Sequence, residues 1–96
     1  MSDDNTIFIG NKPFMNYVTG VVMQFTTKNA EEVAVKARGK FISRAVDVAE
    51  VITKKFMKDE IGIAEIKIDS EEFEAKDKNK KINVSTIEIK LAKKSD

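Results

Sequence analysis

The chain has 96 residues, 42% of them hydrophobic, and a formal net charge of +1. This composition suits a single domain over residues 1–96 with a modest core. We expect residues 1–5 to be loosely held. It contains neither cysteine nor histidine, which excludes disulfides and thiolate or imidazole metal sites and removes the commonest general base. No apolar run approaches the roughly 18 residues that span a membrane, and the N-terminus does not resemble a signal peptide, so we expect a soluble cytoplasmic protein without a cofactor, a small-molecule substrate or membrane contact.

The first third of the chain predicts a strand, a turn and a helix. Residues Thr6–Ile9 have the character of a short buried strand that ends at Gly10. Pro13 suits the first position of the helix that follows, and residues Thr26–Asn29 end that helix. Its apolar face is marked by residues at helical spacing: Phe14, Tyr17, Val18, Val21, Val22 and Phe25.

The middle third predicts a second strand and a second helix on either side of Gly39. Residues Glu31–Arg38 alternate, with the small apolar side chains on one side. The helix face after Gly39 consists of Ile42, Ala45, Val46, Ala49, Ile52 and Phe56. A second apolar stripe on this helix consists of Phe41, Val48 and Val51. This stripe indicates either a deeply buried helix or a subunit interface.

The last third predicts two strands joined by a long hairpin. Ile61 and Ile63 alternate in one register and Ile66 and Ile68 in the other, so a β-bulge is expected between the pairs. The second strand shows the same switch, between Ile82 and Val84 and the later Ile87, Ile89 and Leu91. The charged residues Glu71–Lys81 between the strands predict a solvent-exposed tip. The order βαβαββ predicts an α/β two-layer sandwich, with a mixed four-stranded sheet, two helices on one face and an extended hairpin arm.

Two strand-to-helix junctions are the candidate site. If the first two strands run parallel, Gly10-Asn11-Lys12-Pro13 and Lys36-Ala37-Arg38-Gly39-Lys40 meet at one edge of the sheet. A helix N-terminus favours anions and disfavours a lysine such as Lys12, unless an anion binds there. Helix-start N–H groups and cationic side chains together bind phosphate. The edge would present Lys12, Arg38, Lys40 and Arg44.

Each feature also has a simpler interpretation. The junction lysines and arginines are compatible with an ordinary solvated edge, and Phe56 with a core position. The hairpin lysines are offset by acidic neighbours, which is typical of a solvated loop. Catalysis is not expected, because no nucleotide-binding or nucleophile motif is present and the adjacent carboxylates Glu31-Glu32 and Glu71-Glu72 point to opposite faces of a strand.

Three stretches, IGNKPFMNYV, VKARGKFISRAVDVAEVI and VSTIEIKLAKK, resemble the Alba family of archaeal chromatin proteins in content, order and spacing. The resemblance covers Ile7 to Lys94. It implies a homodimer that binds double-stranded DNA on the chromosome, with RNA binding also known in the family. It assigns nucleic-acid contacts to Asn11, Lys12, Lys36, Arg38, Lys40 and Arg44, and to Lys76, Lys78, Lys80 and Lys81 of an arm from about residue 70 to 82 that follows the minor groove. It assigns subunit or dimer–dimer contacts to Phe56, Val48 and Val51.

Two departures from that family pattern lower the expected affinity. Asn11 stands where the family usually has the lysine whose acetylation is thought to weaken DNA binding, so that switch is in doubt here, and Lys12 is the candidate substitute. The pI of about 7.9 lies below the value above 9 typical of a nucleic-acid footprint. We therefore expect weak, salt-sensitive DNA binding. The alternatives are an RNA-binding role in an RNA-processing or RNA-stabilising particle, and a protein-interaction module whose basic edge binds an acidic partner.

Overall fold

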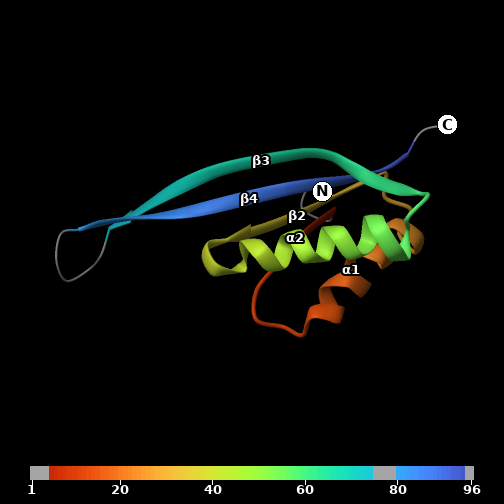
Figure 1. Cartoon of the computed structure of the whole chain (residues 1–96), viewed down its shortest axis with the longest axis horizontal. Helices are drawn as coiled ribbons and strands as arrows, with labels where there is room; N and C mark the ends of the chain where they lie inside the picture. The colour runs from red at the N-terminus through yellow and green to blue at the C-terminus, as the bar shows by residue number, and fades with distance from the viewer. Residues whose placement is uncertain (1–4, 75–79, 95–96) are drawn as a thin grey trace.

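The computed structural model describes residues 5–74 and 80–94, which form one four-stranded sheet with two helices on one of its faces (Figure 1). In chain order the elements are β1 (Thr6–Phe8), α1 (Phe14–Thr26), β2 (Glu32–Arg38), a 3₁₀ turn (Gly39–Phe41), α2 (Ile42–Val51), a π-helical turn (Ile52–Phe56), β3 (Ile61–Glu74) and β4 (Lys81–Lys93). The predicted βαβαββ sandwich is confirmed.

The sheet has the strand order β1-β2-β4-β3. β1 runs parallel to β2, whereas β4 is antiparallel to both β2 and β3, so the sheet is mixed as predicted. Side chains of one face meet the helices, and the fully buried ones on the strands include Val33, Val35 and Leu91. Because side chains alternate along a strand, the other face carries the polar residues of β2, and neither of the two described helices covers it.

The N-terminal end of α1 differs slightly from the sequence prediction. Pro13 has φ −55° and ψ 143°, so its ψ is extended and it precedes the first helical residue, which is Phe14. The Asn16 N–H donates to the Pro13 carbonyl at 3.0 Å, which closes the first turn. The helix ends where expected, and Asn29 adopts a left-handed φ of 55°, which asparagine tolerates better than most residues.

The second helix buries most of the predicted face, with Val48 added and Val46 left exposed. Its core residues are Ala45, Val48, Ala49 and Ile52, at positions i, i+3, i+4 and i+7. Val48, expected at a subunit contact, is fully enclosed by its own chain because it lies in the middle of this stripe. Phe56, by contrast, is 57% exposed. The wider π-helical turn ends at Phe56 and rotates its ring away from Ile52, which in a regular α-helix would lie one turn below it.

One of the two predicted bulges is present. The β3–β4 register shifts between Ile63 and Glu65, which leaves Ala64 as the extra residue. The bulge predicted in β4 is wrong, because its pairing with β3 is continuous across the rest of the strand, through Val84 and Ile87. The apolar residues of β4 change sides for another reason. From Thr86 onward β4 lies between β2 and β3, under the helices. In the residues before Thr86, β4 pairs with β3 alone, and its apolar side chains lie on the open face of the sheet.

β3 and β4 extend beyond the body of the molecule as a two-stranded arm (Figure 1). β3 continues to Glu74 and β4 begins at Lys81, so both ends of the predicted tip, Glu71–Glu74 and Lys81, belong to the strands. The predicted contact residues Lys76 and Lys78 lie outside the described residues, as do residues 1–4. Within the described ranges, no helix is both long and apolar enough to cross a membrane.

Candidate functional site

The two strand-to-helix junctions lie side by side, as the sequence predicted. In the parallel β1–β2 pair Phe8 is opposite Lys36, and the Ile9 N–H donates to the Lys36 carbonyl at 2.9 Å. After β1 and after β2 the chain therefore leaves the sheet at the same end. A direct contact joins the two junctions, because the Arg44 guanidinium donates to the Lys12 carbonyl at 3.1 Å. We call residues Gly10–Pro13 and Arg38–Phe41, together with Arg44, the junction edge.

Tyr17 fixes the first junction. Its hydroxyl oxygen accepts hydrogen bonds from the Gly10 and Lys12 N–H groups, both at 2.9 Å, and the side chain is buried. The sequence prediction counted Tyr17 only as part of an apolar helix face. The signal that could have identified it is that a buried tyrosine hydroxyl needs a polar partner, and the preceding loop supplies two.

The second junction depends on Gly39. Arg38 is still extended, with φ −141° and ψ 156°, and Gly39 then adopts a φ of +58° to start the 3₁₀ turn. A residue with a side chain is strained in this left-handed region. The chain can therefore turn within one residue, which keeps Arg38 and Lys40 next to the end of β2.

Neither helix start carries a negative charge of its own. Within the described residues, α1 has no side-chain cap and no acidic residue in its first turn, and the same holds for the 3₁₀ turn and for α2. Helix-start N–H groups without a cap add a partial positive charge to that of the nearby cations. The junction edge is thus suited to an anion.

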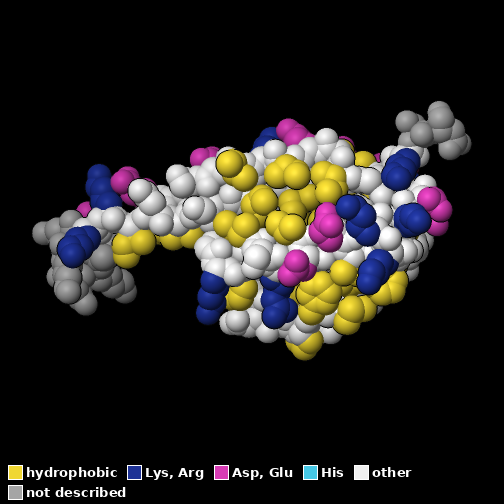
Figure 2. All heavy atoms as spheres, viewed as in Figure 1, with side chains coloured by type: hydrophobic (Ala, Val, Ile, Leu, Met, Phe, Trp, Pro, Cys, Tyr) yellow, Lys and Arg dark blue, Asp and Glu magenta, His cyan; other side chains and the backbone are white. Residues whose placement is uncertain are grey.

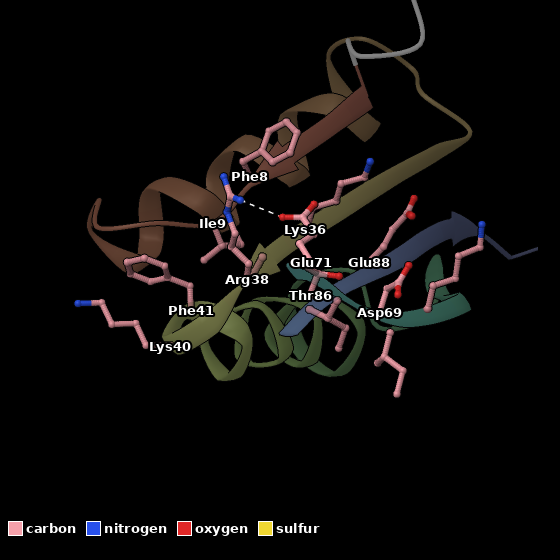
Figure 3. Close-up of a pocket in the computed structure, with 14 residues that line it drawn as sticks. Phe8, Ile9, Lys36, Arg38, Lys40, Phe41, Asp69, Glu71, Thr86 and Glu88 are labelled. Atoms are coloured by element: carbon pink, nitrogen blue, oxygen red, sulfur yellow. Dashed lines mark hydrogen bonds and ion pairs between the residues drawn. The ribbon is translucent and has the colours of Figure 1, made fainter. Parts of the chain in front are cut away.

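Arg38 is held by the base of the arm. Its guanidinium forms an ion pair with Glu71 at 3.0 Å, drawn as a dashed line in Figure 3, and lies 5.7 Å from the ring centroid of Phe73. Both charged side chains are more than half exposed, so the pair is worth only about 0–1 kcal/mol. The sequence analysis related the arm carboxylates to the hairpin lysines and did not foresee that one of them pairs with Arg38.

The remaining predicted cations are distributed over three places. Lys12, Lys40 and Arg44 lie at the junction edge beside exposed Asn11. Lys36 lies within β2 on the open face of the sheet, 5.9 Å from the ring centroid of Phe8. In the arm, Lys81 forms a long ion pair with Glu72 at 3.9 Å, and Lys80 directly precedes β4.

A strip of isoleucines on β3 is exposed although it lies on the helix-facing side of the sheet. Ile63, Ile66 and Ile68 pair with residues of β4 whose side chains enter the core. The helices lie over the strands farther in, so Ile66 is 55% and Ile68 80% exposed. Figure 2 shows hydrophobic side chains gathered between β3 and α2. We call Ile63, Ile66 and Ile68 the β3 strip; exposed apolar patches are a candidate kind of interaction surface.

Comparison with known proteins gives consistent matches. The Alba family model matches residues 5–70. The chain is 56% identical to the "DNA/RNA-binding protein Alba" of Methanococcus maripaludis, over 94% of this chain and 99% of the relative. It is also 56% identical to the protein of the same name in Nanoarchaeum equitans, over 92% and 97% of the two chains. The solved structure of Alba from Thermoplasma volcanium superposes with a TM-score of 0.80 at 49% identity, covering 92% of this chain and 99% of that chain.

The role of Tyr17 can be tested with Tyr17→Phe, which keeps the ring and removes the acceptor of two N–H groups. We expect a loss of about 1–3 kcal/mol in the free energy of unfolding, because the two partly buried donors lose their partner. Amide exchange at Gly10 and Lys12 should become faster. Both quantities are measured by urea denaturation at fixed protein concentration and by NMR.

The matched control for Tyr17→Phe is Thr26→Val, which removes an exposed hydroxyl that donates to the Val22 carbonyl in the same helix. This change should stay within about 0.5 kcal/mol. Unchanged stability and unchanged amide exchange in Tyr17→Phe would show that the hydroxyl does not hold the loop.

Proposed function

The chain belongs to the Alba family, and from this membership we propose that it is a non-catalytic, homodimeric DNA-binding protein of the chromatin type, cytoplasmic and associated with the chromosome. The observation that carries the proposal is the junction edge. There, two helix starts without side-chain caps lie next to Lys12, Arg38 and Lys40 in the chain, and the Arg44–Lys12 hydrogen bond joins the two halves. Such a surface contacts the phosphates of a duplex and reads no base edges, so it suits binding with little sequence preference.

The modest positive charge of this edge predicts weak binding. A dimer that offers Lys12, Arg38 and Lys40 twice neutralises at most about six phosphates, and each contributes about −0.9 to the slope of log K against log salt. The Glu71 carboxylate lowers this number, since a phosphate must displace it from Arg38. We therefore propose steep loss of affinity with salt and tight binding only at low ionic strength.

RNA is the second candidate partner. The names of both relatives describe them as DNA/RNA-binding proteins. Phosphate contacts at the junction edge do not depend on the sugar, so the same surface serves either polymer. The acidic residues Glu71, Glu72 and Glu74 of the arm weigh against deep entry of the arm into a DNA minor groove. Competition between a duplex DNA and a structured RNA of equal length at matched salt separates the two candidates.

The β3 strip supports the homodimer. A second copy of the chain would cover Ile63, Ile66 and Ile68, together with the partly exposed Val51 of α2. Burial of these side chains contributes about 25 cal/mol per Å² of apolar surface. Phe56, at the end of the π-helical turn, lies outside the strip and is a candidate contact between dimers.

Arg38→Ala tests the phosphate contacts. For binding to a random duplex of about 30 base pairs, we expect a salt slope of several units in the wild type and a decrease of one to two units in the variant, since a dimer loses two arginines. Fluorescence anisotropy at several salt concentrations measures both slopes. Lys28→Ala, which removes an exposed lysine at the far end of α1, is the control and should retain the wild-type slope.

An unchanged slope in Arg38→Ala would remove Arg38 from the interface. Failure of the wild type to bind both duplex DNA and structured RNA at low salt would contradict the proposed function as a whole.

Glu71→Gln should raise the affinity for duplex DNA, because it releases Arg38 and removes a negative charge. From the usual strength of an exposed ion pair, we expect an increase of up to about fivefold at low salt. Glu72→Gln is a close control, because it removes the same charge from the neighbouring residue on the opposite side of the strand and releases only Lys81, whose pair with Glu72 is long at 3.9 Å. If the two variants gain equally, the effect is one of net charge and the Arg38–Glu71 pair has no specific role.

Ile66→Lys tests the homodimer. A lysine in the middle of the β3 strip would place two charges inside the proposed interface, and we expect the variant to elute as a monomer while the wild type is a dimer. Size-exclusion chromatography with light scattering gives both masses. Met23→Lys changes an exposed apolar residue of α1 and should remain a dimer. A monomeric wild type, or a dimeric Ile66→Lys, would contradict the proposed interface.

A further inference from the structure

Phe8 is an exposed aromatic residue on the open face of the sheet. Its neighbours Ile7 and Ile9 point toward the core, and the Phe8 side chain is 69% exposed. Exposing a phenylalanine forgoes roughly 1.5–3 kcal/mol of burial, and a polar residue at this position would serve the strand equally well. The fold alone therefore does not explain the ring.

A hollow of about 930 Å³ opens beside this ring (Figure 3). Residues of all four strands line it, among them Lys36, Arg38, Lys67, Thr86 and Glu88. The ammonium group of Lys36 lies 5.9 Å from the ring centroid of Phe8. Arg38, Lys40 and Phe41 also line the hollow, so it extends from the open sheet face to the second junction. The hollow therefore adds a sheet surface that adjoins the junction edge.

The side chains around the hollow match the parts of a nucleotide. An exposed aromatic ring offers a face on which a base stacks, and Lys36 and Arg38 at the rim attract the phosphates on either side of it. Thr86 and Glu88 are hydrogen-bonding groups, and a carboxylate accepts hydrogen bonds from the amino groups of bases. The carboxylates repel phosphate, which favours a ligand that presents a base to them.

A continuous duplex does not present such a base. Its bases are stacked on one another and show only their edges in the grooves, whereas the bases of single strands, loops and bulges are free to stack on aromatic side chains. We propose that Phe8, with Lys36 and Arg38, forms a stacking site for an unpaired nucleobase, so that the open sheet face binds single-stranded nucleic acid. This inference rests on the proposed function and adds to it a ligand that the junction edge does not distinguish.

The test compares Phe8→Ala and Phe8→Tyr with the wild type on two probes. One is a single-stranded RNA of about 12 nucleotides with 2-aminopurine at its centre, and the other is a duplex DNA. Stacking on an aromatic side chain is typically worth a factor of about 5 to 150 in affinity per base. We expect Phe8→Ala to lose affinity in this range for the single strand only, and Phe8→Tyr to retain it. Quenching of 2-aminopurine on binding should occur with the wild type and disappear with Phe8→Ala.

Circular dichroism and the elution volume of Phe8→Ala show whether the variant keeps its fold and its oligomeric state; since the side chain is largely exposed, both should be unchanged. Met23→Ala, which shortens another exposed apolar side chain, is the control for binding and should match the wild type on both probes.

The outcomes separate this inference from the proposed function. Equal losses on both probes, no loss on either, or a change in oligomeric state would overturn the stacking site while duplex binding by the wild type upholds the proposed function. A wild type that binds the duplex and not the single strand would also overturn the stacking site and uphold the proposed function. If the wild type binds neither probe at low salt, both the inference and the proposed function fail.

Discussion

The parallel pairing of β1 with β2 is the constraint on which the candidate site depends. Parallel neighbours end at the same edge, so the chain must leave the sheet twice at one place and begin a helix each time. The Tyr17 hydroxyl and the left-handed Gly39 then determine how the two turns are made, and the Arg44–Lys12 contact joins them. An antiparallel arrangement of the same strands would place the two groups of cations at opposite ends of the molecule.

The position of the charged residues on this molecule matters more than its net charge. With a net charge of +1, the chain lacks the general excess of lysine and arginine that would hold a nucleic acid at any point of its surface. The cations singled out by the sequence analysis lie at the junction edge, on the open sheet face and in the arm, and a carboxylate of the arm pairs with Arg38. In the proposed function a phosphate competes with Glu71 for Arg38, so binding would depend on ionic strength and on contacts other than charge. An aromatic ring on the sheet is a contact of that kind.

Much of this could be predicted from the sequence because it follows from local periodicity. The helical spacing around Val18 and Val21, the alternation in β2 and the shift between Ile63 and Glu65 all appear in the structure. The predictions that were wrong concern features that depend on tertiary contacts. The face that α2 buries depends on what packs against it, and a π-helical turn that the spacing does not reveal rotates Phe56 outward. The side switch in β4 follows from losing one neighbouring strand and not from a bulge.

The site shows the same division. The meeting of the two junctions could be predicted, since it needs only the strand direction. The Arg38–Glu71 pair could not, because it joins residues 33 positions apart whose approach depends on the register of three strands. Phe8 escaped notice because a short apolar run does not say which of its side chains faces the core.

The central claim is that the two junctions act as one phosphate-binding edge, and the most direct measurement is the shift of backbone amide NMR signals as a duplex DNA is added at low salt. The account predicts that the amides of Asn11, Lys12, Gly39 and Lys40 shift together along one binding curve, while the amide of Lys28 at the far end of α1 does not move. Shifts confined to the arm, or two junctions that respond at different DNA concentrations, would contradict it.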